Sequence, residues 1–570
     1  MQTNWNFDLL NTSEEQLKVV EERNLAFATK WKNRTDYLTD PKVLKEALDE
    51  YDDIQKNYGV TGDLGYYYHL RHMQNQLDTN IKAKLNQIEE LGINLQNQNQ
   101  FFLINVSKIP IEKQTLFLES NDLVEYKHFV ERQFAAGKFT LSDVEEKILN
   151  LKSNPAHSAW VSMTSTFLSK ESVSELLSKL SNLDKTVRDD AAVRLNSIFE
   201  KYSDVAEHEM NAILHDKKTD DELRGLTRPD QARHISDDID SEVVDAMLSA
   251  VESKFDLVHK IYKLKAKLLG VEKLKFHERY IPYGTQEMTF DFERSVSIVH
   301  DVFTGLDPKF AEIFERLLNS GQVDVYPAEG KRGGAFCSLN LPTQPIYVLL
   351  NHTNRLTDVQ TLAHEMGHAI QFELMKDLDK ALNYSCQLSI AEVPSTFTED
   401  FVLQRLMMDS NQKDKLTLMV HKLDDEIGSI FRQVAFYRFE QELHQEYRKA
   451  GYLSKGEIGK LFQKHLSAYM GEYVEQSKGS ENWWVYISHF RSFFYVYSYA
   501  SGLLISKALQ AMVKKDPKFI EKIKWFLSQG SSDSPKNLFL ALGIDITDKD
   551  FWLSGISEVE RLYEEVKLLV

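Results

Sequence analysis

Helix breakers are scarce in this chain, and long stretches run without one. The 570 residues include 12 prolines and 24 glycines, and no proline occurs between Pro155 and Pro229 or between Pro394 and Pro517. Proline removes a backbone donor and clashes with the preceding turn, so runs this long, filled with Leu, Lys, Glu, Gln and Ala, favour helices. The sequence therefore predicts a mainly α-helical protein.

The chain is too long for one simple hydrophobic core, so two or more lobes are expected. A composition of 42% hydrophobic and 27% charged residues is typical of a globular protein and not of a disordered one. The segment 171–225 has a helical pattern throughout and is expected to lead from one lobe to the next. We place an N-terminal helical lobe at residues 1–190 and a second lobe at residues 191–570.

The charge and the cysteine count limit the partners and the compartment. A formal net charge of −18 offers no basic surface to neutralise phosphates, which argues against nucleic acid as a partner. Two cysteines make no disulfide framework, so a reducing compartment fits. The N-terminus lacks the pattern of a signal peptide, and the most apolar run, Phe493 to Ile505, is too short to span a bilayer. We expect a cytoplasmic protein with no membrane partner.

The clearest β-signal in the chain covers residues 333–341 and 346–350. Both are short runs of β-formers, separated by prolines, and they predict a hairpin packed against the helix that follows. An edge strand there could pair with an extended peptide, and its glycines would let a substrate backbone approach closely. Gly333, Gly334 and Ala335 are therefore candidate substrate contacts. A flexible loop before a strand explains the same pattern equally well.

A largely buried helix is predicted from Thr357 to Leu374, with Thr357 as its N-cap and Gln360 completing a capping box. It contains His364-Glu365-Met-Gly-His368. Residues i and i+4 share a helix face, so the two imidazoles can hold one Zn²⁺, and Glu365 can reach a water molecule beside it. A chance match on an ordinary surface helix is the alternative. The apolar surroundings favour the metal, because unpaired ionisable groups would be costly there.

A catalytic zinc site needs a third protein ligand. Position 371 is Gln, which rules out a His-x-x-Gly-x-x-His extension, so a carboxylate from a later helix is expected. Glu392 lies in an apolar Ile-Ala-Glu-Val run, and Glu399 returns to the same helix face two turns later. We expect Glu392 to bind the metal and Glu399 to fix a histidine tautomer. An ordinary buried ion pair is the alternative.

An aromatic segment follows much later, at residues 483–502. Tyr495 and Tyr499 are four residues apart, Gly502 continues their face, and His489 precedes them. Tyrosine hydroxyls and an imidazole can stabilise the oxyanion that forms in peptide hydrolysis. From the residues alone, core packing and this catalytic role remain equally good explanations.

Three blocks in fixed order carry a family resemblance. They are His364-Glu-Met-Gly-His368, then Ala391-Glu392-Val-Pro-Ser-Thr-Phe-Thr-Glu399, then Ile487-Ser-His489 with Phe494-Tyr495-Val-Tyr497-Ser-Tyr499-Ala-Ser-Gly502. Together with Gly330-Lys-Arg-Gly-Gly-Ala-Phe336, they resemble the oligoendopeptidase F branch of the thimet-oligopeptidase family. The resemblance covers about residues 100 to 565, including an N-terminal domain of that branch at about 105–185.

This resemblance implies a helical two-lobed clamshell with a deep channel, one Zn²⁺ per chain, and endopeptidase cleavage of short peptides by the 191–570 lobe. It makes His364, His368 and Glu392 the zinc ligands and Glu365 the general base that activates water. His489 with Tyr495 or Tyr499 would donate to the transition state, and Tyr497 is a further candidate contact. Gln371 and Ser488 depart from residues common in the family, which affects expected specificity more than chemistry.

Two other functions remain open at this stage. A zinc carboxypeptidase would need a cation that holds the terminal carboxylate of its substrate. An inactive helical peptide-binding protein would need a dead site, although every ligand and the base are present. The sequence leaves the oligomeric state open between monomer and dimer.

Overall fold

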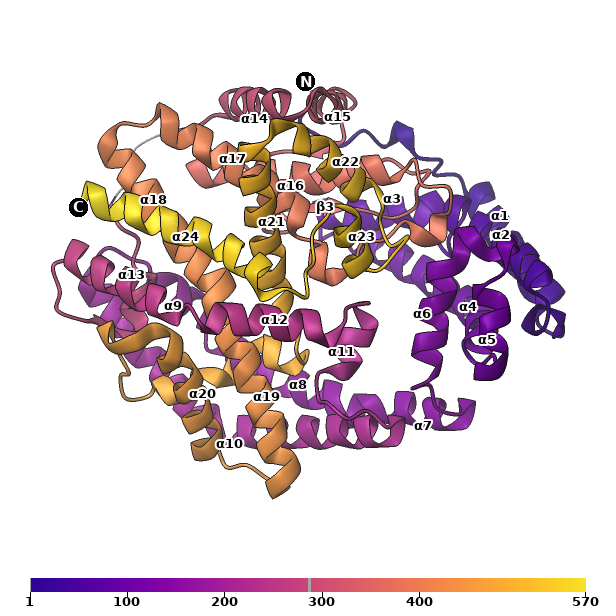
Figure 1. The fold of residues 1–570 in the computed structure, drawn as a ribbon, viewed down its shortest axis with the longest axis horizontal. Coiled ribbons are helices and arrows are strands. Elements are labelled where there is room, and N and C mark those ends of the chain that lie inside the picture. Colours follow the sequence, from indigo (N-terminus) through magenta and orange to yellow (C-terminus); the bar gives the residue numbers. More distant parts are fainter. Residues whose placement is uncertain (1, 285–288) are drawn as a thin grey trace. The chain divides into compact units, whose positions relative to one another are not determined.

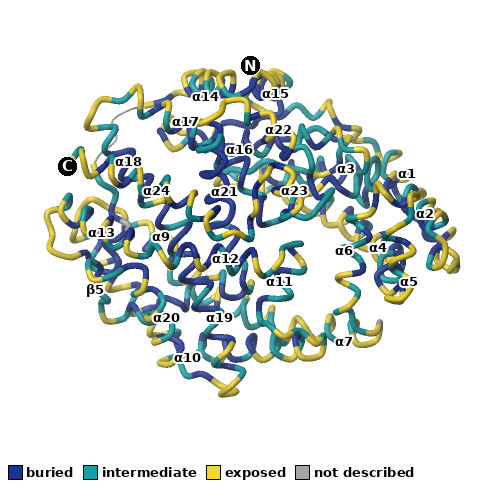
Figure 2. The backbone as a smooth tube through the Cα atoms, viewed as in Figure 1, coloured by how far each residue is buried: buried dark blue, intermediate teal, exposed yellow. Residues whose placement is uncertain are grey.

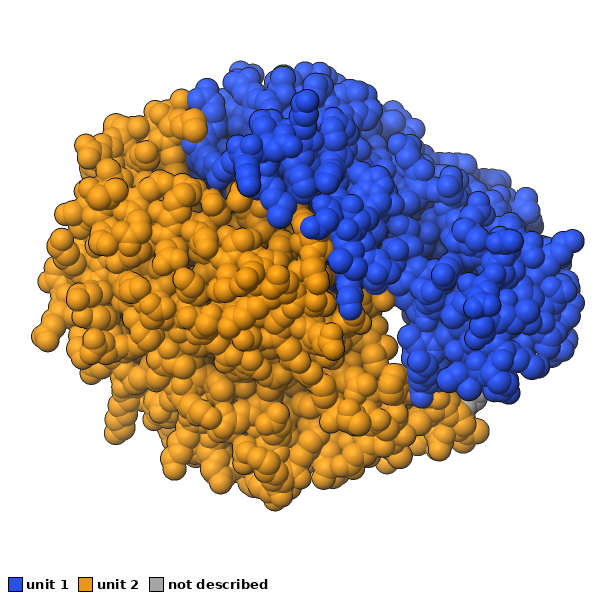
Figure 3. Space-filling model, viewed as in Figure 1, with its two compact units in different colours: residues 1–138, 287–406, 512–543 blue, residues 139–286, 407–511, 544–570 orange. Residues whose placement is uncertain are grey.

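The computed structural model describes residues 2–284 and 289–570 and is mainly helical (Figure 1). The chain forms two compact units, each built from three separate segments (Figure 3). Unit 1 comprises residues 1–138, 287–406 and 512–543, and unit 2 comprises residues 139–286, 407–511 and 544–570. The division expected near residue 190 is a different partition of the chain and stays a prediction, as do the clamshell and its channel.

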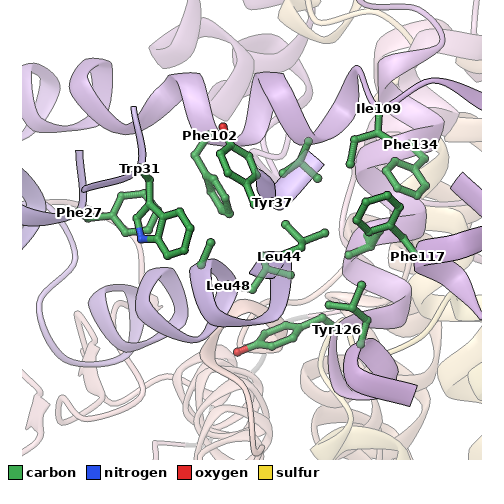
Figure 4. Close-up of a cluster of buried hydrophobic side chains, with 14 of the residues drawn as sticks. Phe27, Trp31, Tyr37, Leu44, Leu48, Phe102, Ile109, Phe117, Tyr126 and Phe134 are labelled. Atoms are coloured by element: carbon green, nitrogen blue, oxygen red, sulfur yellow. The ribbon is translucent and has the colours of Figure 1, made fainter. Parts of the chain in front are cut away.

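Unit 1 begins with a helical bundle. Its helices are α1 (Glu14–Trp31), α2 (Pro41–Asn57), α3 (Gly62–Gln74), α4 (Thr79–Ser107), α5 (Ile111–Leu118) and α6 (Lys127–Gly137). Aromatic side chains fill the bundle's core, among them Trp31, Tyr37, Phe102 and Phe117 (Figure 4). Burial of these large rings is the main stabilising term for such a bundle.

The second segment of unit 1 carries a small sheet and the helix with the two histidines. Its elements are α14 (Phe292–Leu306), α15 (Pro308–Asn319), β2 (Val323–Asp324), β3 (Phe336–Ser338), β4 (Tyr347–Leu349), α16 (Leu356–Met375) and α17 (Val393–Asp409). The third segment adds α22 (Ile520–Ser528) and α23 (Pro535–Ala541). The strand order is β2-β4-β3, with β2 parallel and β3 antiparallel to β4. The predicted hairpin is confirmed as β3 and β4, and both strands contact α16.

Unit 2 is built from long helices. Its elements are α7 (Asp143–Ser153), α8 (Ala159–Lys170), α9 (Val173–Lys179), α10 (Lys185–Arg224), α11 (Gln231–Ser236), α12 (Ser241–Glu252), α13 (Phe255–Leu268), β1 (Leu274–Lys275), α18 (Gln412–Glu426), α19 (Arg432–Ala450), α20 (Lys455–Met470), β5 (Val474–Glu475), α21 (Tyr497–Lys515) and α24 (Lys549–Leu569). Helix α19 packs against α20, and α12 packs against α24. Ser142 and Glu145 form a capping box at the start of α7.

The predicted burial of the helix with the two histidines is confirmed in α16. In Figure 2, α16 and α21 run largely in dark blue, whereas α7 is teal and yellow. Within residues 2–284 and 289–570, no helix combines the length and apolar character that crossing a bilayer requires.

Candidate active site

Helix α16 begins two residues earlier than predicted, because its N-cap is Arg355 and not Thr357. Asp358 Oδ2 accepts the backbone N–H of Arg355 at 2.9 Å and that of Thr353 at 2.7 Å, which caps the first turn. The prediction of Thr357 as N-cap was therefore wrong, because Thr357 already lies inside the helix. Asp358, three residues after the N-cap Arg355, takes the role expected of Gln360 three residues after Thr357, but it accepts from different backbone donors.

The two histidines of α16 lie on one face of the helix and point at one carboxylate. Their ring centroids are 5.1 Å apart. Glu392 Oε2 lies 3.4 Å from His364 Nε2 and 3.7 Å from His368 Nε2. One ligand atom from each of the three residues falls within 4.8 Å of the other two. This is the spacing of three ligands around a single ion.

Helix α17 supplies the carboxylates. The carbonyl of Glu392 accepts the N–H of Thr396 at 3.1 Å, so Glu392 stands at the N-terminal end of that helix. Ser395 Oγ donates to Glu392 Oε2 at 3.1 Å and restricts the carboxylate. Two turns on, Glu399 Oε2 lies 3.1 Å from His364 Nδ1. A proton on Nδ1 would be held there, which leaves Nε2 free to bind a metal.

Gly367 allows α16 and α17 to approach so closely. A Cβ at this position would lie 2.4 Å from Thr398 Oγ1 and 2.5 Å from the carbonyl oxygen of Pro394. Thr398 Oγ1 in turn donates to the carbonyl of Ala363 at 2.9 Å. Gly367 was not among the predicted site residues, although a glycine inside a buried helix signals a close contact of this kind.

The three grouped side chains have opposed protonation preferences. Burial disfavours a charged His364, but hydrogen bonds with Glu392 and Glu399 outweigh it and raise the pKa of His364 to about 10. Burial and the charge of His364 lower the pKa of His368 to about 4. Burial opposes ionisation of Glu392 as well, yet its bond with His364 and the charge of His368 bring its pKa down to about 2. The cluster thus favours a cation beside an ionised Glu392.

Glu365 is buried, with 7% of its surface exposed, on the side of α16 that meets the sheet. Burial raises the pKa of its carboxyl to about 7, although the charge of His364 and a hydrogen bond from the backbone N–H of Cys337 act against the rise. A carboxyl with a pKa near neutrality is well matched to general acid–base catalysis. The contact with Cys337 of β3 was not foreseen, because it depends on how the sheet meets α16.

The aromatic segment forms a second group, wholly within unit 2. His489 Nε2 lies 3.2 Å from the Tyr499 hydroxyl, and the rings of Tyr495 and Tyr499 are 5.5 Å apart. Burial and the nearby charge of Arg432 lower the pKa of His489, so its imidazole is neutral at pH 7. A neutral imidazole and two phenols are hydrogen-bond donors suited to a developing oxyanion.

Tyr497 is placed differently from its neighbours. It is fully buried, and its hydroxyl donates to Asp237 Oδ2 at 2.8 Å. This contact anchors the start of α21 inside unit 2. The predicted contact of Tyr497 with substrate stays a prediction, and the hydroxyl has a structural partner already.

The candidate substrate contacts 333–335 precede β3, an edge strand of the three-stranded sheet. Gly333 and Gly334 are exposed and Ala335 is partly buried. Gly334 has φ of +76°, which glycine adopts freely, and its carbonyl accepts from Asn351 Nδ2 at 2.7 Å. The hydrogen bond from Asn351 therefore holds the backbone of this segment in place. The contact of residues 333–335 with substrate stays a prediction.

Gln371, the departure noted on α16, is buried and adds no ligand. Its Nε2 donates to Cys386 Sγ at 3.4 Å. The amide thus connects the C-terminal part of α16 to the segment that follows the helix.

The donor set fits zinc. Two imidazole nitrogens and one carboxylate oxygen are the three protein ligands typical of catalytic zinc sites. A second group in the described residues, Asp189, His277 and Glu278, fits a metal less well. Lys185 Nζ donates to Asp189 at 2.9 Å and to Glu278 at 3.0 Å, so an ammonium group already supplies the positive charge there.

Comparison with known proteins identifies the family of the chain. Residues 179–558, more than half of the chain, match the family described as peptidase family M3, and residues 106–170 match the one described as oligopeptidase F. An oligoendopeptidase F homolog of Lactococcus lactis is 25% identical over 567 residues, covering 92% of each chain.

Two solved structures show the same fold. A Chlamydophila abortus protein named as a peptidase has a TM-score of 0.86 at 21% identity and covers 100% of this chain and 98% of its own. Oligoendopeptidase F of Enterococcus faecium has a TM-score of 0.70 at 19% identity and covers 98% of both chains.

Proposed function

The chain belongs to peptidase family M3, and from this premise we propose that it is a zinc-dependent oligoendopeptidase that hydrolyses internal bonds of short peptides. The observation that carries the proposal is the group of His364, His368 and Glu392, whose ligand atoms lie within 4.8 Å of one another beside Glu365. The names of its relatives, which are oligopeptidases, support peptides as substrates. A cytoplasmic location remains part of this proposal.

We propose that His364 Nε2, His368 Nε2 and a Glu392 carboxylate oxygen hold one Zn²⁺. Bound there, Zn²⁺ would supply Lewis-acid activation of water and of the peptide carbonyl. Glu399 holds the proton on His364 Nδ1 and thereby keeps Nε2 directed at the ion. Ser395 holds the Glu392 carboxylate in place through the 3.1 Å hydrogen bond.

Glu365 acts as the proton carrier in this mechanism. Its carboxylate takes a proton from the attacking water and passes the proton to the leaving amine. Its burial and its raised pKa, about 7, support both steps, because a group with that pKa gains and loses a proton readily near neutral pH. His489 and Tyr499, with Tyr495 as the alternative phenol, donate hydrogen bonds to the oxygen of the tetrahedral intermediate.

Substrate binding is proposed along β3. Main-chain hydrogen bonds to an edge strand give affinity that depends little on the substrate's side chains. A pocket of about 270 Å³ in unit 1 adjoins this strand and is lined by Ser338, Leu339, Tyr66 and His69. It is large enough to receive a single side chain of a peptide.

The proposal is tested by cleavage of a quenched peptide library with wild type and Glu365→Gln, each with and without a chelator. Glu365→Gln keeps the shape of the side chain, so it should retain about one zinc per chain and lose roughly 10²–10⁴-fold in kcat. Mass spectrometry of the products should show internal cuts. Stepwise loss of single terminal residues, or full activity after zinc is removed, would contradict the proposal.

A further inference from the structure

The turn between His489 and Tyr495 has an unusual backbone. Phe493 and Phe494 both have positive φ, +41° and +56°, in consecutive positions. Side chains with a Cβ rarely adopt this region, and for bulky residues it is a true outlier that persists only when the surroundings enforce it. No glycine relieves the turn, so the structure around it must hold both residues in place.

The backbone of Phe494 is held by a buried carboxyl group. Glu440 of α19 is fully buried, and its Oε1 accepts the N–H of Phe494 at 2.9 Å. Within the described residues its Oε2 has no hydrogen-bond partner. Burial raises the pKa of Glu440 to about 8. A buried carboxyl is costly, and its one described hydrogen bond serves this backbone.

The side chains of Phe493 and Phe494 are held by ring contacts, which cannot replace that hydrogen bond. Phe494 packs against Tyr437 at 5.3 Å and against His444 at 4.8 Å between ring centroids, and Phe493 packs against His157 at 5.7 Å. These contacts fix the side chains. The peptide N–H of Phe494 would be left buried and unpaired without Glu440, and the turn would be free to relax to negative φ.

The chain on either side of the turn is anchored independently. Arg491 forms a buried double hydrogen bond with Glu209, at 3.0 and 2.8 Å, and Tyr497 donates to Asp237. Relaxation of the turn would therefore be taken up between these two anchors and would displace mainly Tyr495. The ring of Tyr495 lies 6.3 Å from that of His489 and 5.5 Å from that of Tyr499, so its displacement would disturb the placement of all three side chains.

We infer that Glu440 is a positioning residue, which holds the strained Phe493–Phe494 turn through its backbone hydrogen bond and thereby sets the relative placement of His489, Tyr495 and Tyr499. All the residues whose placement this inference concerns lie in unit 2. The effect on turnover rests on the proposed function, in which these three side chains donate to the transition state.

Three substitutions distinguish whether Glu440 acts as a hydrogen-bond acceptor for the Phe494 backbone or through a negative charge. Glu440→Gln keeps the acceptor oxygen and the side-chain length but cannot ionise. Glu440→Asp keeps the carboxyl but withdraws it by one methylene group. Glu440→Leu removes the acceptor at similar volume. Val434→Ala, in a fully buried position of the same helix, serves as a control for a general loss of stability.

Glu440→Gln is expected to keep kcat within about threefold of wild type. Glu440→Asp should lose at least tenfold, and Glu440→Leu on the order of 10²–10³-fold, as for loss of oxyanion donors. KM and zinc content should change little in all three. Val434→Ala should lower the melting temperature without this loss of kcat. A fall in kcat for Glu440→Gln equal to that for Glu440→Leu, or full activity of Glu440→Asp, would overturn the inference.

Hydrogen exchange of peptides covering residues 489–499 tests the inference without reference to activity. Glu440→Asp and Glu440→Leu should lose protection in this segment, and Glu440→Gln should keep it. Unchanged protection in both impaired variants would overturn the inference. If wild type hydrolysed no peptide, the proposed function would fail while this measurement still decided the role of Glu440.

Discussion

Three buried or half-buried glutamates show how residue surroundings set chemical roles. Glu392, beside two imidazoles, has its pKa lowered to about 2. Glu365, buried against the sheet, has its pKa raised to about 7, and Glu440, fully enclosed by unit 2, to about 8. The same side chain is thus suited to bind a cation, to carry a proton or to accept a backbone hydrogen bond as a neutral group.

The tyrosines of the aromatic segment should respond differently to loss of their hydroxyl groups. Tyr499→Phe removes the partner of His489 and should lower kcat by roughly 10²–10³-fold with little change in stability. Tyr497→Phe removes the hydroxyl that donates to Oδ2 of the buried Asp237, so it should lower the melting temperature and affect kcat less. Steady-state kinetics and thermal unfolding of both variants check this. A larger loss of kcat in Tyr497→Phe than in Tyr499→Phe would refute the assignment.

The raised pKa of Glu440 predicts a pH dependence of stability. The folded protein binds a proton on this carboxyl between the ordinary pKa, about 4.5, and about 8, while the unfolded chain does not. The stability that the raised pKa of Glu440 contributes to the folded protein is therefore fully present below about pH 4.5. It is lost as pH rises through 8. Arg233 and Asp230 are the charged groups acting on it, in opposite directions.

Glu440→Gln lacks this proton equilibrium, so it provides the comparison. Relative to wild type, its melting temperature should rise progressively between pH 5 and pH 8.5. Thermal unfolding of the two proteins across this range measures the difference. A constant difference at all pH values would show that Glu440 does not titrate in this range.

At the scale of elements, the crossing of α16 and α17 decides whether the ligands meet. Gly367→Ala would place a Cβ 2.5 Å from the Pro394 carbonyl oxygen, which is backbone and cannot move aside freely. We expect the helices to separate, with a loss of about 1–3 kcal/mol in stability and weaker zinc binding, because Glu392 moves with α17.

Gly305→Ala is the matched control for this substitution. Gly305 also lies in a helix of unit 1, α14, and a Cβ there has no neighbour within 4 Å among the described atoms. Alanine is the better helix former, so this variant should be neutral or slightly more stable. Thermal unfolding and zinc titration compare the two. Equal behaviour of both variants would rule out the close crossing as the cause.

At the scale of the whole molecule, the three candidate ligands all belong to unit 1. A bound ion stabilises the state that holds it, so zinc removal should loosen the helices that carry the ligands. Hydrogen exchange after chelation should increase in α16 and around residues 388–400, and zinc should reverse the change. His368→Ala should show the loosened pattern with or without zinc. Equal changes throughout both units would argue against a local site.

Much of this architecture was predictable from the sequence, since local patterns specify it. Sparse prolines and helical periodicity predicted the helical class, and two short runs of β-formers separated by prolines predicted the strands β3 and β4. The short β2 was missed, because two residues, Val323 and Asp324, carry no periodic signal. The predicted start of α16 was wrong, because Asp358 and not Gln360 accepts the backbone N–H of the N-cap residue.

The sequence by itself determined the helical class, the two histidines on one helix face and the order of the three motif blocks. These depend on spacing of residues that are near one another along the chain. Only the tertiary structure brought Glu392 to the histidines, buried Glu365 against Cys337 and enclosed Glu440 beneath the turn at Phe494. The reason is physical: distances and pKa values arise from packing between segments far apart in sequence, such as the contact that Gly367 permits.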